Sequence, residues 1–139
     1  MELLAPAGNK ESLIAAINSG ADAIYLSGKK FGARAYALNF SNEELKEAIR
    51  IGKIYGVKIY VTMNTLVKEN EVEEFLDQLE FLYVNGVDAI LMQDFGMICL
   101  CLKKFPNLEI HASTQAHNVS KEGIDFLYKL GVKRFRSNK

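Results

Sequence analysis

The chain has 139 residues, of which 49% are hydrophobic and 24% are charged, and this composition is ordinary for one globular domain. Its formal net charge at pH 7 is zero, which excludes a global electrostatic attraction to nucleic acid or an anionic membrane but leaves a local basic patch open. No apolar run approaches the roughly 20 residues of a membrane span, no signal peptide is visible, and the only cysteines are Cys99 and Cys101, so we expect a cytoplasmic protein with no membrane partner.

A glycine followed by a short apolar run returns along the chain at Gly20, Gly56, Gly86 and Gly131. Glycine after a helix supplies a left-handed C-terminal turn, and one strand–helix–strand unit needs roughly 30 residues. A further unit lies between the last two glycines, because Pro106 stops a helix and residues 108–112 read as a strand. The pattern therefore predicts a series of βα repeats.

In chain order, the first predicted strand covers residues 2–5, and Asn9 caps a helix that runs to about residue 19. Five later strands are predicted. The second is the apolar run that ends at Ser27, the third covers residues 58–62, and the fourth is the run that ends before Gln93. The fifth covers residues 108–112, and the sixth begins near residue 132. The later helices begin at a capping box of Ser41 and Glu44 and cover residues 69–85, 95–104 and 120–128. No linker or shift in composition interrupts the series, so we expect one domain over residues 1–139.

Alternating strands and helices imply a parallel sheet, which is either an open doubly wound sheet or a (β/α)8 barrel. The first strand–helix turn lacks the glycine-rich dinucleotide fingerprint, which disfavours the doubly wound sheet. Apolar and polar residues also alternate along the strands, so that Glu2, Lys58 and Glu109 could share one charged layer inside a barrel. We predict an α/β fold of the incomplete TIM type, a (β/α) barrel with five complete units and part of a sixth.

Functional residues of a parallel barrel lie at the C-terminal ends of its strands. The predicted strand ends are polar, and the connection that follows Ser27 is too long for a bare link. These positions carry Asn64, Gln93, Asp94, His111, Ser113 and Gln115, together with Arg34, Tyr36 and Asn39 of the long connection.

Each of these residues also has a structural interpretation. Asp94 is consistent with a helix cap, His111 with a buried core histidine, and Ser113 and Gln115 with turn chemistry. Two tyrosines of the predicted strands, Tyr25 and Tyr60, are expected to fill the barrel interior. No metal site is expected, because Cys99 and Cys101 do not share a face of their predicted helix.

An ordered set of short motifs carries a resemblance to a known family. The set consists of Glu2–Gly8, Gly20–Tyr25, Phe31–Tyr36, Asn39-Phe40, Asn64, Gln93-Asp94, His111–Gln115 and Asn118. In this order it resembles the peptidase U32 family of collagenase-like proteins, over essentially all of the chain up to Phe135. The resemblance implies a barrel-like N-terminal half of a longer protein, whose cysteine motif and any iron–sulfur ligands lie beyond this chain.

The resemblance implies three classes of function. Family members named as peptidases exist beside members that hydroxylate a tRNA wobble uridine or a ribosomal cytidine, and relatives that assist ubiquinone hydroxylation. Hydroxylation of an RNA base is the first hypothesis, a U32-type peptidase is the second, and a non-catalytic truncated product is the third. The candidate catalytic residues are Asp94, His111 and Asn64, and the candidate substrate-binding residues are Arg34, Tyr36, Asn39, Gln93, Ser113 and Gln115.

The last four residues, Arg136–Lys139, depart from the apolar continuation expected of the family. We therefore expect a truncated chain that is inactive alone and associates with itself through the open barrel edge. The expected partner is RNA, with Lys29, Lys30 and Arg34 on phosphate, and the cofactor is unknown.

Overall fold

The computed structural model describes residues 2–32, 39–113 and 121–136. Strands and helices alternate along them, as the repeats predict. The strands are β1 (Leu4–Pro6), β2 (Ala23–Ser27), β3 (Lys58–Met63), β4 (Ala89–Met92), β5 (Ile110–Ser113) and β6 (Arg134–Arg136). The helices are α1 (Lys10–Asn18), α2 (Asn42–Tyr55), the 3-10 turn η1 (Glu69–Glu71), α3 (Val72–Val84), α4 (Phe95–Lys104) and α5 (Lys121–Leu130).

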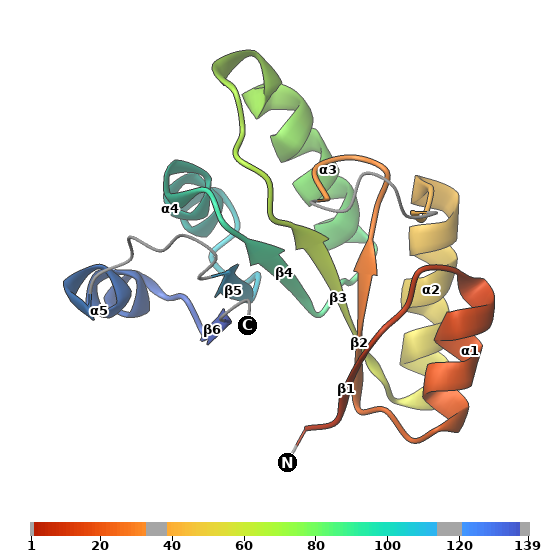
Figure 1. Cartoon of the computed structure of the whole chain (residues 1–139). Coiled ribbons are helices and arrows are strands. Elements are labelled where there is room, and N and C mark those ends of the chain that lie inside the picture. Colours follow the sequence, from red (N-terminus) through yellow and green to blue (C-terminus); the bar gives the residue numbers. More distant parts are fainter. Residues whose placement is uncertain (1, 33–38, 114–120, 137–139) are drawn as a thin grey trace.

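The six strands form one parallel sheet in the order β1-β2-β3-β4-β5-β6, so neighbours in the chain are neighbours in the sheet. A doubly wound sheet reverses its strand order at a switch point, whereas a barrel keeps the sequential order. In Figure 1 the helices follow one another around the outside of the sheet, from α1 through α3 to α5. The prediction of an incomplete TIM-type barrel is therefore confirmed.

The sheet is curled enough for its two edges to meet through side chains. Glu2, directly before β1, forms an ion pair with Arg134 of β6, although these strands lie at opposite ends of the strand order. A flat sheet of this width would separate the two strands by about five spacings of 4.8 Å, far beyond the reach of one ion pair. The face that carries both residues is therefore concave.

Helix ends follow the signals in the sequence. The side chain of Asn9 accepts a hydrogen bond from the Ser12 amide at 2.7 Å and begins α1. The predicted capping box of α2 is present, because the Ser41 hydroxyl accepts from the Glu44 amide and the Glu44 carboxylate accepts from the Ser41 amide. Gly56 ends α2 with φ of 70°, a left-handed conformation that costs glycine little.

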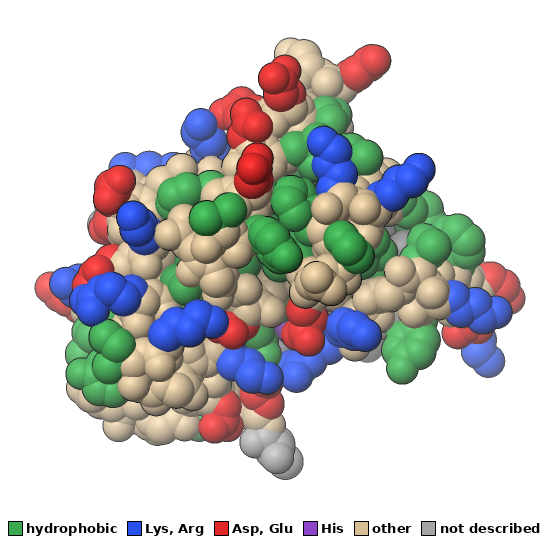
Figure 2. Space-filling view, turned by 180° about the vertical axis from the view of Figure 1, so that it is seen from behind, with side chains coloured by type: hydrophobic (Ala, Val, Ile, Leu, Met, Phe, Trp, Pro, Cys, Tyr) green, Lys and Arg blue, Asp and Glu red, His purple; other side chains and the backbone are tan. Residues whose placement is uncertain are grey.

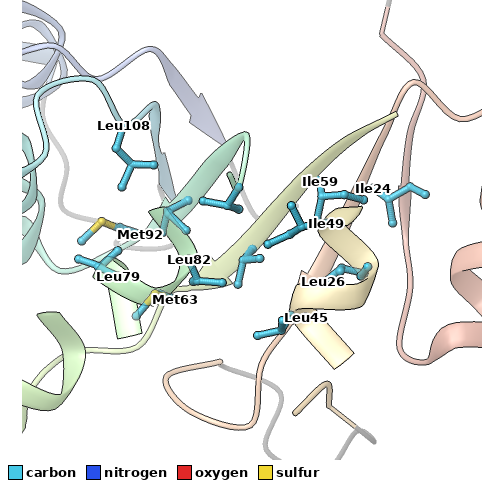
Figure 3. Packing of buried hydrophobic residues seen from close by; sticks show 14 of the residues in the cluster. Ile24, Leu26, Leu45, Ile49, Ile59, Met63, Leu79, Leu82, Met92 and Leu108 are labelled. Carbon is cyan, nitrogen blue, oxygen red and sulfur yellow. The ribbon is translucent and has the colours of Figure 1, made fainter. Parts of the chain in front are cut away.

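The hydrophobic core lies between the sheet and the helices. Ile59 and Met63 of β3 face the helices, where they join side chains such as Leu79 and Leu82 of α3 in one buried cluster. Figure 3 shows this packing from β2 and α2 across to β4. Burial of each large aliphatic side chain contributes on the order of 1.5–3 kcal/mol, so this layer is the main source of the fold's stability.

Several boundaries differ from the predictions by one to three residues, and three of them bear on the packing. The first strand is Leu4–Pro6 rather than residues 2–5, because strand pairing with β2 begins at Leu4 and Ala23. The fifth strand begins at Ile110, although Leu108 before it is buried in the core. The third long helix opens with the 3-10 turn η1.

Across the described ranges, no helix is long and apolar enough to cross a membrane.

Candidate functional site

The concave face of the sheet is lined by a second, smaller apolar cluster. Ala23, Tyr60 and Ala89 are buried there, with Leu4 and Tyr25 packed against them. The rings of Tyr25 and Tyr60 meet edge to face, with centroids 5.4 Å apart. Both tyrosines therefore fill the interior, as the alternation in the strands predicts.

At the N-terminal ends of the strands, Tyr60 belongs to a charged network. Its hydroxyl donates to the Glu2 carboxylate at 2.9 Å, and the Arg134 guanidinium lies 6.0 Å from its ring centroid. The hydrogen bond from Arg134 lowers the pKa of Glu2, and burial followed by the hydrogen bond to Glu2 raises the pKa of Tyr60. Lys58 lies within electrostatic reach of Glu2, and Glu109 within reach of Arg134. The expected charged layer thus forms, with Arg134 as a member that the sequence analysis missed.

His111 faces this interior and not the helices. Its side chain is fully buried, its Nε2 is 2.7 Å from a Glu109 carboxylate oxygen, and its ring centroid is 4.8 Å from that of Tyr60. This hydrogen bond holds the imidazole ring against the Glu109 carboxyl group. His111 is therefore both a buried interior residue and a member of the charged network, one layer below the C-terminal ends of the strands.

The C-terminal ends of the neighbouring strands carry the polar residues that the sequence predicts there. The hydroxyl oxygens of Ser27 and Thr62 are 2.5 Å apart at the ends of β2 and β3. Asn64 and Ser113 are buried, and Gln93 is half-buried directly after β4. Amide and hydroxyl groups of four successive strands, β2 to β5, thus gather at one edge of the sheet, which we call the rim (Ser27, Thr62, Asn64, Gln93, Ser113).

Asp94 is the N-cap of α4. One carboxylate oxygen accepts from the Met97 amide at 3.1 Å, and the other accepts from the Val67 amide at 2.9 Å. No hydrogen bond or ion pair joins Asp94 to His111, both of which lie in the part of the chain that the structure describes. A shared pocket of Asp94, His111 and Asn64 stays a prediction.

The long connection after β2 is described only at its ends. Gly28 pairs with Phe40 through an isolated bridge, and Asn39 before it is half-buried. Lys30 forms an ion pair with Glu74 at 2.9 Å. The predicted substrate residues Arg34, Tyr36 and Gln115 lie outside the described residues.

Charge on the surface is unevenly placed. Figure 2 shows acidic side chains gathered at the top of the molecule, the end that Figure 1 assigns to η1 and the start of α3. These elements carry Glu69 and Glu71, then Glu73 and Glu74. These carboxylates would repel phosphate, so Glu74, which pairs with Lys30, would oppose an RNA contact of that lysine.

Within the described ranges, no group of three or more His, Cys, Asp or Glu side chains is placed to hold a metal ion. Cys101 is buried, which raises the pKa of its thiol to about 12, and Cys99 is half-buried. Sequence reasoning expected Glu109 in the charged layer but missed it as the partner of His111, and it missed Arg134 altogether. A signal was present for Glu109, since it lies two residues before His111 and shares its face of the strand.

The comparisons with known proteins agree with one another. The model of peptidase family U32 matches residues 8–136. The chain is 38% identical over 133 residues to a tRNA hydroxylation protein P1 of Bacillus subtilis, covering 96% of this chain and 32% of that protein. It is 40% identical over 131 residues to a 23S rRNA 5-hydroxycytidine synthase of Escherichia coli, covering 94% of this chain and 19% of that protein. A collagenase of Porphyromonas gingivalis is 32% identical over 127 residues, 90% of this chain and 30% of that protein.

The chain therefore spans a third or less of the length of these relatives. Among solved structures, a U32 peptidase superposes with a TM-score of 0.77 at 14% identity, covering 97% of this chain and 57% of that one. A 2,3-dimethylmalate lyase gives a TM-score of 0.67 at 11% identity, over 98% and 53% of the two chains. At these identities the likeness shows the barrel fold alone.

Proposed function

The chain belongs to the peptidase U32 family, and from that premise we propose that it supplies part of the barrel of a protein that hydroxylates a base of tRNA or rRNA. The observation that carries this proposal is the identity of 38–40%, over almost the whole chain, to relatives named for tRNA hydroxylation and 5-hydroxycytidine synthesis. Residues 1–139 form a single partial barrel domain in this proposal. Because the substrates are cellular RNAs, the protein acts in the cytoplasm.

The rim supports recognition of a base. Asn64 and Gln93 each offer an amide oxygen and an amide nitrogen, and Ser113 offers a hydroxyl, which match the donors and acceptors of a base edge. An enzyme that modifies a base takes that base out of its stack into a pocket, and the C-terminal end of a barrel is the usual place for such a pocket. Asn39, Arg34, Tyr36 and Gln115 contribute from the flanking connections in this proposal.

One layer below the rim, His111 is the proposed acid–base group. Its Nε2 lies within hydrogen-bond distance of Glu109, which would orient the ring for proton transfer. Hydroxylation replaces C–H by C–OH and withdraws two electrons from the base, so an oxygen donor and an electron acceptor are needed. Neither is assigned to residues of this chain, and an iron–sulfur cluster in the longer relatives remains part of the same proposal.

The proposal is tested in a bacterial strain deleted for its own tRNA and rRNA hydroxylation genes. The whole protein to which this partial barrel belongs, its Asn64→Ala variant and an empty vector are expressed, and digested RNA is analysed by nucleoside mass spectrometry. Hydroxylated uridine or cytidine is expected with the wild type and reduced at least tenfold in the variant.

The peptidase hypothesis is tested on the same preparation, because a relative is named a collagenase. Purified protein is incubated with gelatin and with casein. Cleavage that Asn64→Ala abolishes, in the absence of any hydroxylated nucleoside, would overturn the RNA proposal in favour of a protease.

Self-association is the remaining part of the proposal. Within the described sheet, β1 pairs only with β2 and β6 only with β5, so each leaves one edge with unpaired backbone groups. We expect the purified chain to elute from size-exclusion chromatography as a dimer or larger species. A monomer with one cooperative thermal transition would contradict this expectation.

A further inference from the structure

The Asp94 carboxylate serves two different loops of the barrel. It lies directly after β4 and caps α4, because one oxygen accepts from the Met97 amide at 3.1 Å. Its other oxygen accepts from the Val67 amide at 2.9 Å, and Val67 belongs to the loop that follows β3. One side chain therefore joins the loop after β3 to the start of the helix after β4.

This loop after β3 carries a rim residue at its start. Asn64 is buried directly after the strand, Leu66 is 71% exposed, and Val67 packs against the core. Because this loop makes few buried apolar contacts, its backbone hydrogen bonds matter for holding it in place. The bond from the Val67 amide to Asp94 is one of them, three residues from Asn64.

Gln93 lies on the other side of the same bond. Gln93 directly precedes Asp94 in the loop after β4. The Asp94 carboxylate in turn bonds the loop after β3, which begins with Asn64. The tether thus sets the separation of Asn64 and Gln93, which come from adjacent strands.

We infer that Asp94 is a positioning residue that holds the loops after β3 and β4 together at the rim. Its importance for activity rests on the proposed function, whereas the tether itself does not. Each carboxylate oxygen of Asp94 already accepts one backbone amide, which orients the group toward the two loops. The geometry assigns both oxygens to the backbone and leaves the chemistry to the rim residues that they position.

Two variants separate the cap from the tether. Asp94→Ser keeps a good N-cap, because a serine hydroxyl bonds the amide near the helix start, but one hydroxyl is too short to reach Val67 as well. Asp94→Ala removes both bonds. Asn9→Ala is the matched control, because Asn9 caps α1 at 2.7 Å and its side chain makes no bond to another loop of the described chain.

Amide hydrogen exchange measures the tether without any activity. In Asp94→Ser we expect the Val67 amide to exchange at least tenfold faster while the Met97 amide keeps its protection. In Asp94→Ala both amides should exchange faster, and in Asn9→Ala neither should change relative to global stability. An unchanged Val67 exchange rate in Asp94→Ser would overturn the inference, whether or not the protein acts on RNA.

RNA hydroxylation then separates a positioning role from a catalytic one. Asp94→Ser should lose at least tenfold in kcat/KM with a pH–rate profile of unchanged shape, since no titrating group of the reaction is removed. Loss of one limb of that profile would make Asp94 a catalytic acid or base and overturn the assignment. Absence of hydroxylation by the whole wild-type protein would refute the proposed function, and the exchange rates of the Val67 and Met97 amides would still test the tether.

Discussion

The ion pair between Glu2 and Arg134 should stabilise the curled sheet, because it links strands at opposite ends of the strand order. The Glu2 side chain is 22% exposed and that of Arg134 is 39% exposed, so water screens the pair in part. Exposed ion pairs contribute about 0–1 kcal/mol, and hydrogen bonds to less solvated charged groups contribute about 1.5–3 kcal/mol. Between these limits we expect a coupling free energy of about 1 kcal/mol, which lowers Tm by about 3 °C when the pair is lost.

A double-mutant cycle measures this coupling. The variants are Glu2→Gln, Arg134→Gln and the double substitution, each unfolded with urea. The matched control is the cycle for Glu47 and Arg50, an ion pair three residues apart on the exposed surface of α2. This local pair is exposed to water, so its coupling should be smaller than that of Glu2 and Arg134.

The pH dependence gives a second signature of the same pair. The hydrogen bond from Arg134 holds the pKa of Glu2 below its ordinary value of 4.5. The stabilisation is therefore complete above about pH 4.5 and is lost as the pH falls through the lowered pKa. Glu2→Gln should flatten this part of the stability profile. A coupling no larger than that of the control, with an unchanged acid profile in Glu2→Gln, would refute the reasoning.

Two further predictions concern packing and RNA. Gly52→Ala should lower the free energy of unfolding in urea by about 1–3 kcal/mol, because a Cβ would lie 2.6 Å from Ile59 and 2.7 Å from the Val57 carbonyl oxygen. Gly96→Ala is the control: its Cβ would meet only Asp94, at 3.5 Å, so the substitution should be neutral or stabilising. Lys30→Ala should weaken RNA binding and reduce its salt dependence, whereas Glu74→Gln, which releases Lys30 from its ion pair, should strengthen binding. The affinities of the wild type and the two variants are compared by filter binding. Equal affinities would exclude Lys30 from the RNA contact.

Local signals in the sequence were sufficient for the elements and for the fold class. The capping box of Ser41 and Glu44, the caps Asn9 and Asp94 and the left-handed Gly56 each depend on residues within one helical turn. Such interactions are present wherever those few residues occur in order, so they can be read without knowing the fold. The sequential strand order then follows from the repeated βα unit and the missing dinucleotide fingerprint.

The candidate site was only partly predictable. Polar residues at the strand ends, such as Asn64, Gln93 and Ser113, follow from the rule that parallel strands end at one edge of a sheet. The two uses of Asp94 could not be separated by sequence, because its bond to Val67 spans 27 residues. For His111, the sequence left a catalytic role and a buried core position both open, and its partner Glu109 was not identified.

What the sequence by itself determined is the set of repeats, their caps and the face of each strand that is polar. Only the tertiary structure decided that Arg134 meets Glu2, 132 residues away, and that Tyr60 and His111 pack against one another inside the barrel. The physical reason is that strand periodicity specifies the face on which a side chain lies but not the curvature of the sheet. Curvature is the sum of the twist of every strand pair, and it alone brings the first and the sixth strand within reach of one ion pair.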